Sequence, residues 1–341
     1  MTAFIDRLTG RVADDDRARD SAADQADKRA SIAASESSES TLPLRYPGKV
    51  AVDGERIAIS DSGNNRVIVG RLEGKSIRVE LLVGGERGFV DGQTAAFDSP
   101  QGLTFHGNTL FVADAENHAI RAIDLMSGVT RTVAGTGNQL RTVQDRNEGA
   151  LSSPWDVTVV DGRIYVAMAG VHQLWEIDAA TGSGRVYAGS GGEDIRDGPR
   201  EEALLAQPMG ITRGEQRLYF SDSESSAIRC CATRTGEVDT IVGTGLFDFG
   251  DVDGVGDKVR LQHPQGIATA PDGRLLIADS YNDSLKWIDA GSRTSTRWIG
   301  GLNEPGGVAC GADCAYVADT NAHRIMAVDY TTAKVTSLEL S

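Results

Sequence analysis

Six copies of one segment occupy most of this 341-residue chain, and this repetition limits the folds open to it. Each copy begins at a proline, and an aliphatic residue follows three positions later. The intervals between successive prolines are 53, 54, 54, 56 and 41 residues. Repetition at such a period is typical of architectures in which every copy packs against its neighbours. The six prolines are Pro47, Pro100, Pro154, Pro208, Pro264 and Pro305.

Each copy contains four short β-type runs separated by turn residues. In the second copy they begin at Leu103, Leu110, Ile120 and Thr130, and no long amphipathic helical pattern lies between them. One four-stranded sheet exposes both faces, whereas a ring of such sheets buries them. The 40 glycines suit tight turns and close backbone approach near an axis. We therefore predict an all-β fold, a six-bladed β-propeller with four antiparallel strands per blade, over residues 45–341.

Residues 1–44 differ in composition from the repeats. Residues 13–34 consist mainly of Ala, Asp, Arg and Lys, and Ile32 is almost the only large apolar residue. Ala, Arg and Lys favour helix, but there is no apolar stripe to dock a helix on a core. Residues 35–40 read as a polar linker. We predict a short N-terminal extension that is helical or poorly ordered.

Charge and cysteine usage narrow the choice of partner and compartment. The chain carries 34 basic and 49 acidic residues, a net charge of −15. This surplus argues against a nucleic acid or an anionic membrane as the partner, because phosphate must be met by basic side chains. Four cysteines without zinc-like spacing are typical of reduced thiols. With no apolar run of membrane-spanning length and no secretory signal, we expect a cytoplasmic monomer.

An aspartate recurs fourteen or fifteen residues after the proline in five of the six copies, and Met168 replaces it in the third. A catalytic acid is needed in one copy, not in five. The recurrence therefore favours a structural role, in which the carboxylate accepts hydrogen bonds from turn N–H groups. These residues are Asp61, Asp114, Asp222, Asp279 and Asp319.

His118, His172 and His323 each follow the aspartate or methionine position by four residues. Three imidazoles at matching places could bind a metal ion. Equivalent positions in different blades lie around a circumference, however, and are too far apart for one ion unless they point to the axis. We therefore favour packing of the turns over metal or proton chemistry.

Asp251, Asp253 and Asp257 alternate with small residues in a glycine-rich loop. Carboxylates at this spacing suit calcium, but the glutamate at position twelve of an EF-hand loop is absent. Asp91-Gly92 and Asp197-Gly198 occupy the equivalent loops and favour a turn instead. The three aspartates remain candidate calcium ligands, and we predict no cofactor. There is also no phosphate-binding glycine loop and no nucleophile elbow.

The turn Asn117-His118 with Ile120 resembles the NHL repeat, which is named after these residue types. Non-repetitive stretches extend the resemblance to the propeller of the NHL-repeat-containing protein 2 family and its bacterial relatives, over residues 44–341. Members of that family carry a thioredoxin-like domain before the propeller. Here the preceding residues are too few for that domain and contain no cysteine. The stretches are 152–157, 167–175, 222–226, 249–256, 261–264 and 303–307.

These features favour a non-catalytic scaffold that binds a protein or peptide through loops on one face. The longest loops follow the fourth strands, at 136–153, 189–207 and 244–263, and we expect them to select a neutral or basic partner. One alternative is a metal-dependent hydrolase or lyase of the six-bladed class, which rests on fold analogy alone. Another is a redox-associated subunit that acts with a separate thioredoxin-like protein.

Overall fold

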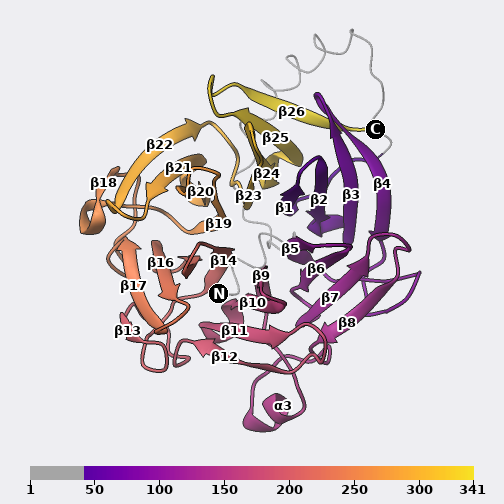
Figure 1. The fold of residues 1–341 in the computed structure, drawn as a ribbon, viewed down its shortest axis with the longest axis horizontal. Helices are drawn as coiled ribbons and strands as arrows, with labels where there is room; N and C mark the ends of the chain where they lie inside the picture. The colour runs from indigo at the N-terminus through magenta and orange to yellow at the C-terminus, as the bar shows by residue number, and fades with distance from the viewer. Residues whose placement is uncertain (1–41) are drawn as a thin grey trace, which may run out of the picture.

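The computed structural model describes residues 42–341. Within this range six four-stranded antiparallel meanders surround a central axis, with the first strand of each innermost (Figure 1). The predicted all-β propeller fold is confirmed. The predicted helix or disorder of the N-terminal extension concerns residues that lie, up to residue 41, outside the described part. Among residues 42–341 no helix is long and apolar enough to cross a membrane.

The first three blades, each given from the inner to the outer strand, run from Pro47 to Ala188. Blade 1 contains β1 (Pro47–Asp53), β2 (Arg56–Asp61), β3 (Arg66–Glu73) and β4 (Ser76–Gly84). Blade 2 contains β5 (Pro100–His106), β6 (Thr109–Asp114), β7 (Ala119–Asp124) and β8 (Thr130–Ala134). Blade 3 contains β9 (Pro154–Val160), β10 (Arg163–Met168), β11 (Gln173–Asp178) and β12 (Gly184–Ala188).

The last three blades follow the same order, and the fourth and fifth gain a two-residue edge strand. Blade 4 contains β14 (Pro208–Arg213), β15 (Arg217–Asp222), β16 (Ala227–Ala232) and β17 (Glu237–Val242), with β13 (Gly198–Pro199) at its edge. Blade 5 contains β19 (Pro264–Thr269), β20 (Leu275–Asp279), β21 (Ser284–Asp289) and β22 (Thr294–Gly300), with β18 (Gly254–Val255) at its edge. Blade 6 contains β23 (Gly307–Cys310), β24 (Cys314–Asp319), β25 (Arg324–Asp329) and β26 (Val335–Leu340).

Helical structure in residues 42–341 is limited to single short turns. The α-helix α3 (Val143–Asn147) lies in the loop between blades 2 and 3 and is capped by Thr142. The 3₁₀ turns η1, η2, η4 and η5 each join the second and third strands of a blade, and η3 lies beside β18. Their bounds are Ser62–Asn64, Ala169–Val171, Ser280–Asn282 and Thr320–Ala322 for the first four and Gly256–Lys258 for η3.

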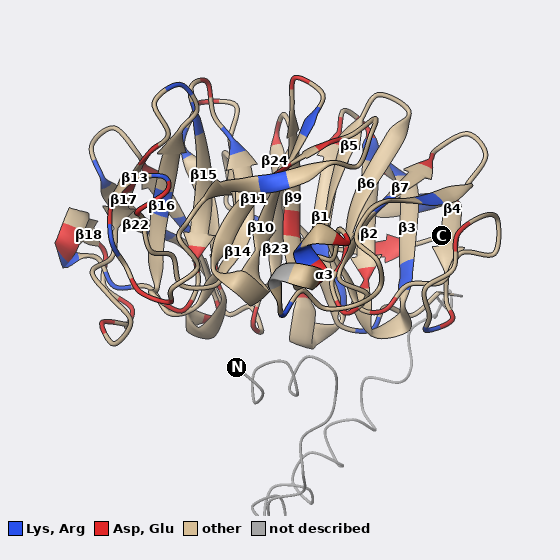
Figure 2. Cartoon of the chain, turned by 90° about the horizontal axis from the view of Figure 1, so that it is seen from below, with Lys and Arg blue, Asp and Glu red and all other residues tan. Residues whose placement is uncertain are grey.

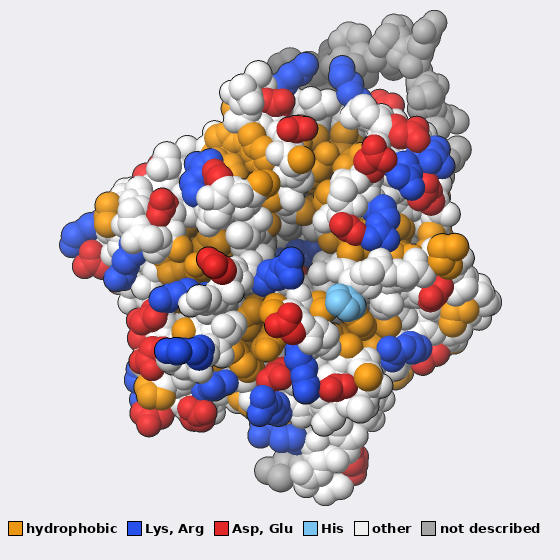
Figure 3. Space-filling model, in the orientation of Figure 1, with side chains coloured by type: hydrophobic (Ala, Val, Ile, Leu, Met, Phe, Trp, Pro, Cys, Tyr) orange, Lys and Arg blue, Asp and Glu red, His pale blue; other side chains and the backbone are white. Residues whose placement is uncertain are grey.

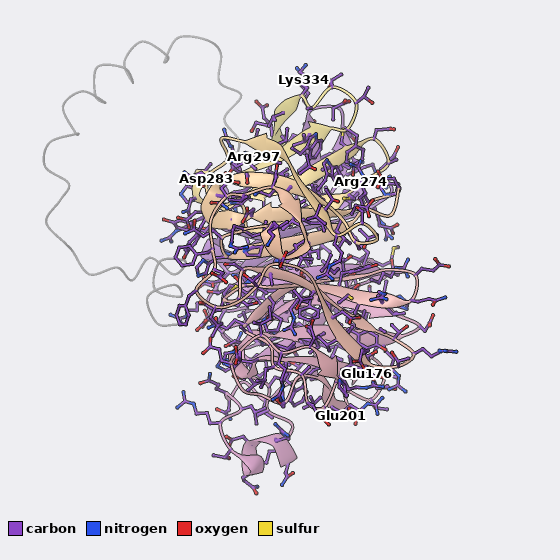
Figure 4. All side chains as sticks on the ribbon, turned by 90° about the vertical axis from the view of Figure 1, so that its left-hand side faces the viewer. Glu176, Glu201, Arg274, Asp283, Arg297 and Lys334 are labelled. Carbon is purple, nitrogen blue, oxygen red and sulfur yellow. The ribbon has the colours of Figure 1, made fainter. Side chains whose placement is uncertain are left out.

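The two faces of the disc differ in their connections. Tight hairpin turns lie at one end of the sheets, the hairpin face. At the other end, the loop face, the outer strand of each blade leads back to the inner strand of the next through residues 85–99, 135–153, 189–207, 243–263 and 301–306. Figure 2 shows the disc edge-on, and in Figure 4 Asp283 on the loop face and Arg274 on the hairpin face lie on opposite sides.

The strands are apolar on both faces because each sheet lies between two others. Ile57, Ala58 and Ile59 are consecutive residues of β2, and all three are fully buried. Successive side chains of a strand point to opposite faces, so burial of all three requires a neighbour on each side. The apolar clusters accordingly join adjacent blades; one of them combines Phe111 of blade 2 with Val166 of blade 3.

The ring closes through the chain's last strand. β26 is the fourth strand of blade 6 and also pairs in parallel with β4 of blade 1, at Glu339 with Ser76 and Leu340 with Ile77. The sheets of blades 1 and 6 therefore form one continuous eight-stranded sheet, and the other four blades remain separate sheets. Residues 42–46 form no strand. Each blade contains its own four strands, and none is exchanged between the first and last blades.

Candidate functional site

The five repeat aspartates are fully buried at the ends of the second strands. One carboxylate oxygen of each, Oδ1, accepts a hydrogen bond from the backbone N–H two residues before the proline of the same blade. In blade 2, for example, Asp98 donates to Asp114 at 2.8 Å. The aspartate thus fastens the inter-blade loop at the point where it turns into the inner strand, a longer-range bond than an Asx turn. The donors to Asp61, Asp222, Asp279 and Asp319 are Arg45, Ala206, Gln262 and Asn303, at 2.6–2.8 Å.

The second oxygen of each aspartate faces a basic side chain. Arg121, itself fully buried, lies 2.7 Å from Asp114 and 2.7 Å from Asp91, and donates to the backbone carbonyls of Ala96 and Val90. Burial raises the pKa of Asp114 to about 6, although Arg121 and other donors oppose the shift. The other basic partners are Arg66 for Asp61, Arg229 for Asp222, Lys286 for Asp279 and Arg324 for Asp319.

The third blade replaces both members of this ion pair with apolar residues. Met168 stands at the aspartate position and is fully buried. Trp175 stands seven residues later, where the second blade has Arg121, and its indole N–H donates to Gln173 at 3.0 Å. The two substitutions occur together, so no charge is left unpaired in this blade at these positions.

The three histidines form hydrogen bonds between neighbouring blades. The Nδ1 atom of His118 accepts from the backbone N–H of Ser153, directly before Pro154 of the next blade, at 3.0 Å. His172 and His323 make the same bond to Gln207 and Tyr46, at 3.2 and 3.0 Å. The bond from Tyr46 joins the last blade to the first. Each Nδ1 must carry no proton to accept this bond.

Other side chains form the same inter-blade bond in the remaining three blades. Residues at the histidine position and those that donate to them all have positive φ, between 44° and 55°. Asn, Asp and His tolerate this region better than most other side chains. We call these six bonds the inter-blade clamps. The other acceptors are Asn65, Ser226 and Asp283, which bind the N–H groups of Ser99, His263 and Glu304 at 3.0, 3.3 and 2.8 Å.

A lysine ammonium occupies the neighbourhood of the candidate calcium ligands. Lys286, which is fully buried, lies 2.7 Å from Asp251 and 3.5 Å from both Asp253 and Asp279. Asp257 is instead exposed and lies 3.7 Å from Lys258. Within residues 42–341 no three His, Cys, Asp or Glu side chains are placed to hold a metal ion together.

A second ion pair lies at the axis, where sequence reasoning did not place one. The residue two positions after the proline is glycine in four blades: Gly102, Gly210, Gly266 and Gly307. In blades 1 and 3 it is Lys49 and Asp156, which are 3% and 8% exposed. The ammonium of Lys49 lies 3.5 Å from Asp156 and donates to two backbone carbonyls, Met209 at 3.0 Å and Gln265 at 2.9 Å.

The geometry of Lys49 makes it a bridge across the ring. It begins in blade 1 and reaches partners in blades 3, 4 and 5. Asp156 in turn accepts from the backbone N–H groups of Val157 and Ile211, so both charges are compensated. Burial lowers the pKa of Lys49 and raises that of Asp156, and their mutual attraction opposes both shifts. A sixfold alignment contains the signal for this pair, namely two charged residues at a position where the other copies have glycine.

Two separate cavities lie on the axis. The first, of about 170 Å³, is lined by Lys49, Asp156 and residues further along the inner strands, such as Thr104, Thr158 and Thr212. The second is smaller and lies at the loop face among the residues that directly follow the prolines. They share no lining residue. Figure 3 shows the hollow at the centre of the hairpin face.

We predict that Arg121→Met lowers the free energy of unfolding by about 3–5 kcal/mol, because it leaves the carboxylate of Asp114 buried without its partner. Adding Asp114→Met recreates the apolar character of the third blade and recovers more than half of this loss. The measurement is urea unfolding of both variants. Arg71→Met, which breaks exposed pairs, is the control and changes the free energy by less than about 1 kcal/mol. Equal losses in the single and double variants would contradict this reading.

The clamp of His118 makes the stability of the folded protein depend on pH. Burial, followed by the charge of Arg141, lowers the pKa of His118 below its ordinary value of about 6.5. The unfolded chain therefore binds a proton more readily. The stabilising contribution is complete above about pH 6.5 and is lost as the pH falls through the lowered pKa.

We predict that His118→Asn, which places at this position the residue that serves blade 1, makes stability less dependent on pH between 7.5 and 5. Melting temperatures of wild type and variant across this range measure the effect. His106→Asn, on the hairpin face, is the control and keeps the wild-type profile. A His118→Asn profile parallel to wild type would show that the clamp does not titrate.

The axial ion pair is testable by a double-mutant cycle. Lys49→Met strands a buried carboxylate and is expected to cost about 3–5 kcal/mol of unfolding free energy. Asp156→Asn keeps hydrogen-bonding atoms at the site but removes the charge. The double variant should lose less than the sum of the single losses, by about 1–3 kcal/mol, because the two side chains interact directly. Additive losses in chemical denaturation would refute a direct interaction.

Comparison with known proteins connects this geometry to a family. The NHL repeat family matches residues 151–177 and 261–288. The chain is similar to the protein suppressor of quenching 1 of the Arabidopsis thaliana chloroplast, with 39% identity over 324 residues, covering 85% of this chain and 31% of that protein. It is also similar to NHL repeat-containing protein 2 of Gallus gallus, 37% identical, and of Homo sapiens, 36% identical; each match covers 87% of this chain and 48% of the relative.

Solved structures share the fold at low sequence identity. A streptogramin B lyase has a TM-score of 0.56 at 13% identity, covering 88% of this chain and 85% of that one. A chain of a nidogen/laminin complex has a TM-score of 0.60 at 14% identity, covering 81% and 90%. The present chain spans about half the length of NHL repeat-containing protein 2 and about a third of the plant protein. The repeats, the sheets and these relatives place the chain in the NHL-repeat β-propeller family.

Proposed function

We propose that this propeller is a binding module that holds a protein or peptide partner on its loop face. The observation that carries the proposal is the exposure of large apolar side chains in the loop between blades 4 and 5. Phe247 is 89% exposed and Phe249 is 53% exposed, and Val252 and Val255 of the same loop are about half exposed. Clustered apolar side chains on a surface are typical of interaction sites, and loops on a rigid frame commonly carry recognition.

The loop that carries these side chains is held in place by its polar residues. The backbones of Val252 and Arg260 bond to each other in both directions, at 3.0 and 2.9 Å. Asp251 is drawn inward by Lys286 and Arg297. The hydroxyl of Thr244 donates to Asp248, which stands between the two phenylalanines, at 2.8 Å. A loop ordered before binding loses less conformational entropy when a partner docks.

Charge indicates the kind of partner. The net charge of −15 and the carboxylate of Asp248, which stands between the two phenylalanines in the sequence, favour a neutral or basic surface with an apolar anchor over a nucleic acid. A thioredoxin-like protein acting in trans stays a prediction, which the identity of the captured partner will test.

The prediction is that a photoreactive phenylalanine at position 247 forms one discrete adduct in cells, because that side chain contacts the partner. The partner is identified by mass spectrometry, purified, and titrated against the full chain. Phe247→Ser with Phe249→Ser should weaken binding at least about tenfold, a loss of about 1.4 kcal/mol or more.

Met126 offers a matched control on the hairpin face, where its side chain is 84% exposed in the β7–β8 turn. A photoreactive residue at position 126 should give no adduct with the same partner, and Met126→Ser should bind it like wild type. Adducts of the same protein from both positions, or unchanged affinity of the double phenylalanine variant, would overturn the proposal.

A further inference from the structure

Three blades cover the outer edge of their fourth strand with a segment of the loop that precedes the blade. In blade 2 the backbones of Gly92 and Thr130 bond to each other in both directions, at 2.8 and 3.1 Å. In blades 4 and 5 the two-residue strands β13 and β18 pair with β17 and β22 at the rim of the disc (Figure 1). Blades 1 and 6 pair with each other through β4 and β26. The outermost strand therefore has a partner in each of these five blades.

The three covering segments share an aspartate followed by a glycine. The glycine pairs with the outer strand, and the carboxylate accepts the backbone N–H two residues further along that strand. In blade 2 Asp91 accepts from Thr132 at 2.9 Å and lies 2.7 Å from Arg121 of the third strand. In blades 4 and 5 the aspartates are Asp197 and Asp253, which accept from Thr240 and Arg297 at 2.9 and 2.7 Å and pair with Arg229 and Lys286.

The loop before blade 3 lacks this aspartate and glycine. Eleven positions before the proline, blades 4 and 5 have Asp197 and Asp253, whereas blade 3 has Val143. The loop forms α3 at this point, and α3 projects from the rim beyond β12 in Figure 1. β12 is the terminal strand of its sheet, and among residues 42–341 no strand or isolated bridge pairs with its outer edge. Blade 3 thus has an open edge in this part of the chain.

Backbone groups of β12 point outward at this open edge. Pairing with β11 places Gly184 at the position that Thr130 has in blade 2, and Val186 at the position of Thr132. Gly184 is exposed and Val186 is half-buried, and the described residues supply no hydrogen bond to their outward groups. An open strand edge of this kind is a template for pairing with another segment.

A groove of about 260 Å³ lies beside the open edge, and we call it the β12 groove. Gly184, Val186, Trp175 and Leu151 contribute to its lining. The groove reaches the indole because Gly184 has no side chain, and a Cβ atom there would lie 3.5 Å from the ring of Trp175. Arg146 of α3 and an arginine of β12 also line it, whereas none of the described lining residues is acidic. The groove therefore combines an apolar surface with positive charge.

Arg146 supplies a cation where the third strand of this blade has none. Trp175 stands at the position of Arg121, so β11 offers no charge to a carboxylate at the edge. The guanidinium of Arg146 lies 5.8 Å from the centre of the indole ring of Trp175. Arg185 is bonded to Glu176 at 2.7 Å. Arg146 is exposed, and within residues 42–341 its guanidinium makes no ion pair or hydrogen bond, so it is available to a carboxylate of a ligand.

We propose that the β12 groove binds an extended peptide segment of a partner protein, and that this segment carries an aspartate followed by glycine. Its glycine exchanges backbone hydrogen bonds with Gly184, and the segment becomes a short added strand of blade 3. Its carboxylate accepts the N–H of Val186 and pairs with Arg146. This site goes beyond the proposed function, because it lies on the rim and selects an acidic segment, whereas the loop face suits a neutral or basic surface.

The test uses the full chain and a blocked, fluorescently labelled peptide with the sequence of residues 88–94, which contains Asp91 and Gly92. Fluorescence anisotropy should show saturable binding. A peptide with Asp91→Asn lacks the charge, and one with N-methylglycine in place of Gly92 lacks a backbone donor. Each should bind at least about fivefold more weakly, because each loses one of the contacts that define the site. Equal affinities of the three peptides, or no saturable binding, would refute the proposal.

Variants of the chain test the groove itself. Arg146→Gln should weaken binding of the peptide at least about fivefold, and Gly184→Val should weaken it further by filling the groove beside Trp175. Arg234→Gln is the matched control, since this arginine is exposed in the β16–β17 turn on the hairpin face, and it should bind like wild type. Melting temperatures confirm folding, and if Gly184→Val does not fold, the exposed Arg146 decides. Unchanged affinity of Arg146→Gln would contradict the proposed contact.

Hydrogen exchange locates the peptide on the chain. Bound peptide should slow the exchange of the Gly184 and Val186 amides and leave that of Thr132 unchanged, because Thr132 already donates to Asp91. Protection elsewhere, with none at β12, would overturn the assignment. Protection of β12 that grows with the concentration of the chain in the absence of peptide would show that a second copy pairs with this edge, and the peptide proposal would be wrong.

The rim site and the loop-face site fail separately. Phe247→Ser with Phe249→Ser should keep its affinity for the peptide, because the loop that carries these residues does not line the β12 groove. Arg146→Gln should in turn keep the partner that is captured through position 247. If the phenylalanine variant also loses the peptide, the two sites are not independent and the rim proposal is refuted as stated.

Discussion

The ring depends on hydrogen bonds made by turns, because the sheets themselves hardly bond to each other. Within residues 42–341 the strand ladders run inside blades, with the β4–β26 pair as the one ladder between two blades. Apolar contacts hold neighbouring blades together but are not directional. The six inter-blade clamps supply direction, since each ends on the N–H group directly before a proline, where the next inner strand begins. Each clamp requires a positive φ at both the donor and the acceptor residue, a strained backbone conformation that the surrounding structure must hold in place.

Buried charge strengthens the same junctions at the cost of desolvation. Each repeat aspartate joins a loop to a basic side chain within its own blade, and Arg121 and Arg229 extend the network to Asp91 and Asp197 in the preceding loops. Buried ion pairs often contribute little net stability, but losing one partner is expensive. The third blade shows that the junction does not require charge, because Met168 and Trp175 fill the same positions. The buried ion pairs of the other five blades therefore add directional bonds at positions that apolar side chains can also fill.

The sequence predicted the features that follow from the period of the repeat, and it missed contacts between side chains that the fold brings together from distant parts of the chain. The strands and the propeller followed from the spacing of apolar runs around six prolines. The clamps were visible only in part, because Asn65, Ser226 and Asp283 make the same bond as the histidines with different chemistry. The spacing of Asp251 and Asp253 suggested a calcium site. Spacing alone does not reveal that the ammonium of Lys286 lies close to both carboxylates. The pairing of Lys49 with Asp156 joins two blades that are not neighbours in the ring, and only the closed ring brings them together.

The axial pair also makes the two ends of the propeller chemically different. Lys49 lines a cavity that also has threonines and aliphatic side chains, whereas the cavity at the loop face is lined by hydroxyl, carboxamide, indole and carboxylate side chains. The loop-face cavity contains the acidic residue Glu116 as well as neutral donors and acceptors, whereas the ammonium of Lys49 is bonded to Asp156 and to two backbone carbonyls. That same face carries the long loops and the exposed phenylalanines. A partner docked on these loops would therefore approach the ring from the face opposite the threonine-lined cavity, which opens on the hairpin face.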